Sequence, residues 1–253
     1  MSLDPAFFTT SAFLVTVAAA AIAALVRGFT GFGAALIFVP VASAAYGPTV
    51  AAPTLLIVDF VLTLPFFFKG LGHCRWPTVL PAAIAAMALS PIGAWALVIG
   101  NQITLRWAIS LAILALVGLV VSGWRYRSEP AIPVSASVGA VAGFLSGFAQ
   151  IGGPPMIALW VSGPLPPKTI RANMFVFFSL ITLASFTAYL VNGLFTPAVL
   201  RLGVAIAPVY GLALYVGSHV FGRSAGAGYR PLAYVTVAAA AITSLPLFDG
   251  LLR

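Results

Sequence analysis

Hydrophobic residues run along this chain in long stretches, which short clusters of charged, glycine and proline residues interrupt. Most stretches hold about 17–25 residues, the length that crosses the hydrocarbon core of a bilayer as a helix. Ten segments are predicted, at Phe7–Val26, Phe29–Tyr46, Val50–Phe68, Thr78–Ile99, Ile103–Ser122, Val134–Phe148, Gly152–Ser162, Thr169–Val191, Ala198–Phe221 and Leu232–Leu247. The segment that starts at Gly152 is too short to cross alone, so we expect a half-helix there.

Composition leads to the same class of protein. Of the 253 residues, 62% are hydrophobic and 6% are charged, and the mean hydropathy is +1.12. A soluble domain needs more charge to cover its surface, so we expect an all-α polytopic membrane protein. The formal net charge of +8 does not indicate nucleic-acid binding, because the basic residues cluster in short loops. The lone Cys74 has no CxxC or histidine partner, so neither a metal site nor a cofactor is expected.

The basic residues predict an orientation. If all ten segments cross and the N-terminus lies outside, nine basic residues fall on the cytoplasmic side and three outside. The inner set is Arg27, Lys69, Arg75, Arg125, Arg127, Lys168, Arg171, Arg223 and Arg230, and the outer set is Arg106, Arg201 and Arg253. Both termini are therefore expected outside, and Arg27 is expected in a cytoplasmic link. Residues 1–6 carry no positive charge, so no cleavable signal peptide is expected.

The two halves of the chain resemble each other at an offset of 119 residues. This offset aligns Gly28 with Gly147 and Gly33 with Gly152, and it preserves the order of glycine break, apolar segment, proline turn and long helix. We predict a first membrane repeat at 1–123, a cytoplasmic linker at 124–133 and a second membrane repeat at 134–253. Five helices per repeat is an odd number, so the second repeat is expected to be inverted in the membrane.

Two glycine-rich interruptions lie at corresponding places in the halves, RGFTGFGAALIFVPV (Arg27–Val41) and GFLSGFAQIGGPPMIALWV (Gly143–Val161). Broken helices survive at membrane depth only where protein or a cavity covers them, and a matching pair predicts the binding site of a transporter. Free N–H groups at the start of a helix suit an anion, and glycine allows it to approach the backbone. The candidate binding residues are Gly28, Thr30, Gly31, Phe32, Gly33, Ser146, Gln150, Ile151, Gly152, Gly153 and Asn173. Tight helix packing is the alternative explanation for each single glycine.

Three further side chains are candidates. Asp59 is an acid deep within an apolar helix, where a carboxylate costs at least about 2.5 kcal/mol. It could carry a coupling proton, or it could be the fixed partner of a basic residue. Arg171 could attract an anion, although an ordinary cytoplasmic anchor is the favoured explanation for it and for Arg27. Trp160 could line the pathway or belong to the interfacial aromatic belt.

The motifs GFTGFGAALIFVP, followed by YGP, and GFAQIGGPPMIALWVSGPLPPKTIRANMFVFF resemble the paired signatures of the TauE/SafE family. This resemblance implies a secondary transporter that moves sulfite, a sulfonate or another small organosulfur anion across the bacterial cytoplasmic (inner) membrane. Its partners would be the anion, membrane lipid and, if Asp59 titrates, a proton; a homo-oligomer is left open. An enzyme is not expected, because no HExxH, GxSxG or paired-Asp motif is present. An anion channel or a non-transporting scaffold is the alternative.

Overall fold

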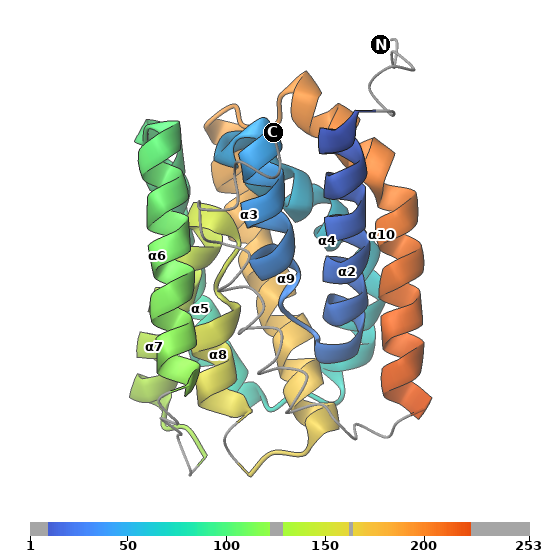
Figure 1. Ribbon diagram of the computed structural model, residues 1–253. Helices are drawn as coiled ribbons and strands as arrows, with labels where there is room; N and C mark the ends of the chain where they lie inside the picture. The colour runs from blue at the N-terminus through green and yellow to red at the C-terminus, as the bar shows by residue number, and fades with distance from the viewer. Residues whose placement is uncertain (1–9, 122–128, 162–163, 224–253) are drawn as a thin grey trace.

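The computed structural model describes residues 10–121, 129–161 and 164–223, and these residues form helices without a strand (Figure 1). The helices are α2 (Ser11–Thr30), α3 (Ala34–Tyr46), α4 (Pro48–Leu71), α5 (Trp76–Ile99), α6 (Gln102–Val121), α7 (Ile132–Ala149), α8 (Gly153–Trp160), α9 (Pro167–Val191) and α10 (Pro197–Arg223). They lie within a few residues of the first nine predicted segments. The tenth, Leu232–Leu247, lies outside the described residues.

Six of the described helices are long and apolar enough to cross a membrane, namely α2, α4, α5, α7, α9 and α10. Helix α3 has 13 residues and α8 has 8, so both are short for a crossing. The predicted half-helix is therefore found at α8, and α3 is a second short helix. The structure supports an all-α multi-pass membrane protein, whereas ten crossings in inverted repeats stay a prediction.

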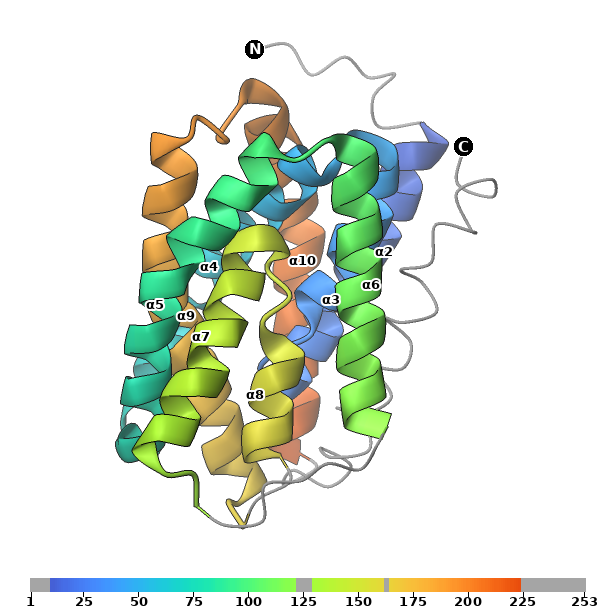
Figure 2. The ribbon, with the colours of Figure 1, turned by 90° about the vertical axis from the view of Figure 1, so that its left-hand side faces the viewer.

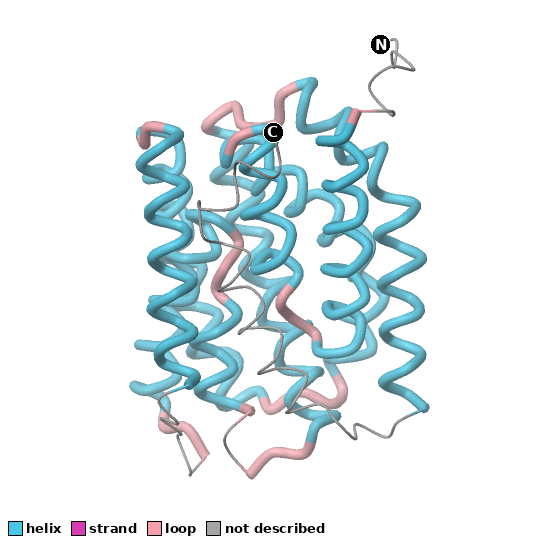
Figure 3. The backbone as a smooth tube through the Cα atoms, viewed as in Figure 1, coloured by secondary structure: helices cyan, strands magenta, loops and turns pink. Residues whose placement is uncertain are grey.

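Successive helices run in alternating directions through the bundle (Figures 1 and 2). The turn between α2 and α3 and the turn between α7 and α8 both lie inside the bundle rather than at its ends (Figure 3). Helix α3 starts near the middle and runs to the upper end, and α8 starts near the middle and runs to the lower end. The N-termini of the two short helices therefore face each other from opposite directions.

Packing links the first part of the chain to the second. Helix α2 packs against α10, α7 packs against α5, and α4 packs against α9. At the first of these crossings, a Cβ atom added to Gly28 would overlap the carbonyl oxygen of Leu214, and one added to Gly217 would overlap that of Leu25. Glycine is required there because the two backbones touch, as is usual where membrane helices pack closely.

The crossing of α5 and α7 repeats these contacts. A Cβ atom at Gly147 would overlap the carbonyl oxygen of Ser90, and one at Gly93 would overlap that of Phe144. Gly28 and Gly147 are 119 residues apart, as the internal alignment predicts. The same close approach therefore occurs once in each of two helix pairs.

Basic side chains gather at one end of the bundle. Helix α4 ends beside Lys69, α9 starts beside Lys168 and α10 ends at Arg223. Because these helices alternate in direction, the three residues share the lower end in Figure 1, here called the basic end. Arg106 and Arg201, near the starts of α6 and α10, lie at the opposite end.

Candidate functional site

The two helix breaks are built from residues with unusual backbone conformations. Gly31 caps the C-terminus of α2, and both Gly31 and Gly33 have positive φ angles, 83° and 93°, which residues with a side chain rarely adopt. Helix α7 ends at Gln150, which also has a positive φ, 62°. The breaks touch each other, because a Cβ atom added to Gly153 would lie 3.3 Å from the ring of Phe32.

Neither short helix has a side-chain cap at its N-terminus, where Gly33 precedes α3 and Gly152 precedes α8. The first turn of a helix holds N–H groups without a partner in that helix, and the helix dipole is positive there. In α8, Pro154 and Pro155 remove two of these donors, so α3 supplies more N–H groups than α8. Two positive helix ends thus converge inside the bundle.

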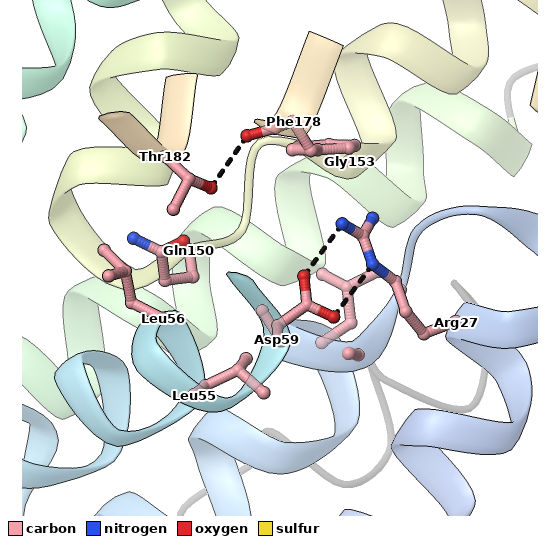
Figure 4. A pocket seen from close by; sticks show the side chains of 12 residues that line it. Arg27, Leu55, Leu56, Asp59, Gln150, Gly153, Phe178 and Thr182 are labelled. Atoms are coloured by element: carbon pink, nitrogen blue, oxygen red, sulfur yellow. Dashed lines mark hydrogen bonds and ion pairs between the residues drawn. The ribbon is translucent and has the colours of Figure 1, made fainter. Parts of the chain in front are cut away.

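A cavity of about 30 Å³ lies where these ends meet (Figure 4). This volume is room for about one or two water molecules. The cavity is bounded by both breaks and by α2, α4 and α9, through Arg27, Gly33, Ala34, Ala35, Leu36, Leu55, Leu56, Asp59, Gln150, Gly153, Phe178 and Thr182.

A buried ion pair forms one wall of the cavity (Figure 4). Arg27 Nη2 lies 2.8 Å from Asp59 Oδ2, and Arg27 Nε donates to Asp59 Oδ1 at 3.1 Å. The hydroxyl of Tyr210, on α10, also donates to Asp59 Oδ1, at 2.7 Å. Only 5% of the Arg27 side chain and 17% of the Asp59 side chain are exposed. Opposite charge and hydrogen bonds therefore compensate the burial of both groups.

The placement of Arg27 corrects one prediction. Arg27 was expected in a cytoplasmic link, but α2 continues past it to Thr30, and the side chain is buried. Its Nη1 donates to the carbonyl oxygen of Gly31, and its guanidinium lies over the rings of Phe175 and Phe178, 5.2 and 5.1 Å from their centroids. A carboxylate, a helix-end carbonyl and two aromatic faces thus hold the cation, which explains why it does not extend to the membrane surface.

Arg171 lies between this pair and the basic end. It donates to the carbonyl oxygen of Gly28 at 2.6 Å and to the hydroxyl of Ser218 at 3.0 Å. Its guanidinium lies 4.9 Å from the centroid of Phe175, the ring that also contacts Arg27. Arg171 thus ties α9 to α2 and α10.

The structure brings only part of the predicted binding set to the cavity. Gly33, Gln150, Gly153 and Asp59 line it. The other candidates, which do not line it, are Gly28, Thr30, Gly31, Phe32, Ser146, Ile151, Gly152, Asn173 and Arg171.

Several of these other candidates have visible local roles. Gly28 serves the packing of α2 on α10, and the Thr30 hydroxyl bonds to the backbone oxygens of Val26 and Phe32. Asn173 accepts from the backbone N–H of Arg75 at 2.7 Å, so it stabilises the start of α5. The packing explanation therefore fits Gly28.

Two more residues lie beside the second break. A Cβ atom at Gly152 would overlap the carbonyl oxygen of Ala142, so this glycine is needed for the turn between α7 and α8. The Ser146 hydroxyl is close to Gly152 and buried, and no described residue forms a hydrogen bond with it. Trp160 is fully buried and packs edge-on against Phe177, so the belt interpretation of Trp160 is wrong.

Sequence reasoning missed Tyr210 and the ring cluster of Phe175 and Phe178. A tyrosine in the middle of the apolar run AIAPVYGLAL is a detectable signal, because a buried hydroxyl needs a partner. No spacing rule joins it to Asp59, which lies on a helix far away in the sequence. The phenylalanines could not be distinguished from ordinary apolar positions of a membrane helix.

A multi-pass helical bundle whose two broken helices meet beside a charged cavity is typical of membrane transporters. The sequence pattern of the family described as sulfite exporter TauE/SafE matches residues 16–244, nearly the whole chain, and the protein belongs to this family. Its members are transporters rather than enzymes. Comparisons with curated proteins and with solved structures gave no match.

Proposed function

We propose that the protein is a secondary transporter that moves sulfite, a sulfonate or another small organosulfur anion across the bacterial cytoplasmic membrane. The observation that carries this proposal is the cavity between the N-termini of α3 and α8, with Arg27 in its wall. Half-helix N-termini that face each other inside a membrane bundle favour an anionic group. An arginine beside them adds donors that match a planar or pyramidal oxyanion.

Asp59 gives the site a built-in competitor for the anion. Its carboxylate engages two donors on one edge of the Arg27 guanidinium, Nε and Nη2, as a bound oxyanion would. An incoming anion that takes over this guanidinium leaves Asp59 with its bond from Tyr210 and an uncompensated charge. A proton on Asp59 removes that charge, so anion binding and proton uptake would be coupled at this residue.

The cavity volume implies that the half-helices move during transport. About 30 Å³ holds water but not an organosulfur anion. Movement of α3 away from α8 would separate Phe32 from Gly153 and enlarge the space between the breaks.

An inverted repeat, if the two halves form one, would support such movement. The crossings of α2 with α10 and of α7 with α5 both place a backbone carbonyl against a glycine, Gly28 in one and Gly147 in the other, which the 119-residue offset aligns. Two repeats of opposite orientation, each with its own half-helix, can open in turn to the two sides of the membrane. A division into repeats at 1–123 and 134–253, both termini outside and a homo-oligomeric state remain parts of the proposal that need separate tests.

The test is flux through the purified protein in liposomes with sulfite, thiosulfate, sulfoacetate, taurine and sulfate. A carrier gives saturable uptake that is accelerated by anion on the opposite side. Current that increases linearly with voltage without saturation would instead establish the alternative, an anion channel. If protein that melts cooperatively, and is therefore folded, shows no flux of any of these anions, the remaining alternative is a non-transporting scaffold.

Gly153→Ala tests the location of the site. The added methyl group points towards Phe32 at 3.3 Å and narrows the cavity without touching the ion pair. We expect the KM to rise about tenfold, equivalent to about 1.4 kcal/mol of binding. Gly222→Ala is the control, because a methyl group there meets no atom of the described residues within 4 Å. An unchanged KM in Gly153→Ala would show that the substrate does not bind between the two helix breaks.

A further inference from the structure

A hollow opens at the basic end between the last turns of α4 and α10 and the first turn of α9. It has a volume of about 400 Å³ and adjoins a groove of about 490 Å³ between α4 and α10. The two share Phe66, Lys69 and Ser218. We call the first the basic hollow, because Lys69, His73, Lys168 and Arg171 line it.

The charges around the basic hollow have one sign. Among the described residues that line it and the adjoining groove, none is an aspartate or glutamate. Within the described part of the chain, Lys69 and Lys168 form no ion pair, since the two ion pairs there are Arg27 with Asp59 and Arg75 with Glu129. Three cations around a partly apolar hollow repel each other and raise the local concentration of anions.

Arg171 gives the hollow a fixed cationic wall. Its bonds to the Gly28 carbonyl and the Ser218 hydroxyl, and the faces of Phe66 and Phe221 at 5.5 and 4.5 Å, hold the guanidinium in one position. Positive-inside residues that merely reach the interface lack such support from three helices. The hollow thus combines a positioned guanidinium with the ammonium groups of two exposed lysines.

One aromatic ring joins the basic hollow to the buried ion pair. Phe175 lines the hollow, is 1% exposed and stacks on Phe66 with centroids 5.0 Å apart. The guanidinium groups of Arg27 and Arg171 both lie over this ring. An anion in the hollow therefore lies next to the inner site.

We propose that the basic hollow binds an oxyanion group, a sulfonate, sulfate or phosphate, at Lys69, Lys168 and Arg171. Two sources can supply this chemistry. A soluble oxyanion would be the substrate collected before it enters the inner site, and this part rests on the proposed function. The phosphate of an anionic lipid headgroup would occupy the same cations from the membrane side, since basic pockets between membrane helices bind such headgroups.

The experiment measures binding of radiolabelled inorganic sulfate to the full-length protein in nanodiscs of phosphatidylcholine. The test variant is Lys69→Gln with Lys168→Gln, two exposed positions whose replacement leaves the helix contacts intact. The matched variant Lys69→Arg with Lys168→Arg keeps the charge, and Arg201→Gln removes a charge from the opposite end. We expect the Kd of the glutamine double variant to rise about tenfold and that of both controls to stay within about twofold.

A second arm repeats the measurement in nanodiscs that contain phosphatidylglycerol. Loss of sulfate binding there in the wild type identifies the lipid phosphate as an occupant, and unchanged binding identifies a soluble oxyanion. Both outcomes support the site. Equal sulfate binding by the glutamine double variant and the wild type, in both lipids, would overturn it.

Flux separates this proposal from the proposed function. If the wild type binds sulfate through Lys69 and Lys168 but transports no sulfur anion, the oxyanion site in the hollow is supported and the proposed transport function is refuted. If the wild type transports sulfite but replacement of both lysines leaves sulfate binding unchanged, the transport function is supported and the oxyanion site in the hollow is refuted.

Discussion

Removal of one charge from the Arg27–Asp59 pair should destabilise the protein more than removal of both. Asp59→Leu leaves a buried guanidinium with only the Gly31 carbonyl and two ring faces. Breaking a buried pair in this way costs about 3–5 kcal/mol. Arg27→Met leaves a carboxylate that keeps only its bond from Tyr210, with a cost in the same range of about 3–5 kcal/mol.

The double variant Arg27→Met with Asp59→Leu fills the same volume with apolar groups and leaves no buried charge. Such replacements are neutral or stabilising by about 1–4 kcal/mol in other proteins. Each single variant already removes one further bond, that of the Gly31 carbonyl in Arg27→Met and that of the Tyr210 hydroxyl in Asp59→Leu, at about 1–3 kcal/mol. The double variant loses both bonds but holds no unpaired charge, so it should melt above both single variants. The coupling between the two positions should thus be several kcal/mol.

The assay is reversible unfolding of all four proteins in one lipid or detergent, with flux driven by a pH gradient measured on the same preparations. Effects that simply add would refute the reasoning, because they would mean that the two charges do not compensate each other. Asp59→Asn separates the two roles of the carboxyl group. If Asp59 couples transport to protons, this variant loses pH-driven flux and still binds substrate; if it is only structural, it loses stability, about 1–3 kcal/mol, and keeps pH-dependent flux.

Three other expectations follow from single contacts. Gly217→Ala should cost about 1–3 kcal/mol in unfolding measurements, because its methyl group would overlap α2, whereas Gly222→Ala on the same helix should cost nothing; equal effects would contradict the close crossing. Tyr210→Phe should lower the unfolding free energy by about 1.5–3 kcal/mol through loss of a hydrogen bond to a carboxylate, and unchanged stability would show that this bond contributes little. The pKa of the Glu129 carboxyl is lowered by its hydrogen bonds from Arg75, so their contact should persist below pH 4.5 and be lost as the pH falls through the lowered pKa. An NMR titration of the Glu129 carboxyl checks the direction of this pKa shift, and a titration midpoint at or above pH 4.5 would contradict it.

The helices were predictable because membrane crossings leave long apolar runs with clear ends. The apolar pattern predicts a helix at Val50–Phe68, and α4 spans Pro48–Leu71. Its earlier start arises because proline fits the first turn of a helix. The place of the first break was less accurate. The sequence predicts an interruption from Arg27 onwards, but α2 continues to Thr30, and Gly28 lies within the helix, where it admits the backbone of α10.

The site was predictable only in outline. The glycines of the two breaks indicated where the half-helices meet, and Asp59 stood out because a lone acid in an apolar helix needs a reason. Its partner did not stand out, because Arg27 borders a glycine cluster and resembles every other basic residue at a helix end. Which charge meets which across α2, α4 and α10 depends on how these helices are placed around each other, and no local pattern records this.

The packing of the first part of the chain against the second has a consequence for biosynthesis. Helix α2 is the first described helix to leave the ribosome, and its main packing partner, α10, is the last. Until α10 is inserted, the face of α2 that carries Gly28 lacks the neighbour it has in the finished bundle. Asp59 arrives much earlier, on α4, and can neutralise the Arg27 charge while the chain is still being made. The ion pair therefore compensates the buried charge of α2 in the membrane before α10 packs against this helix.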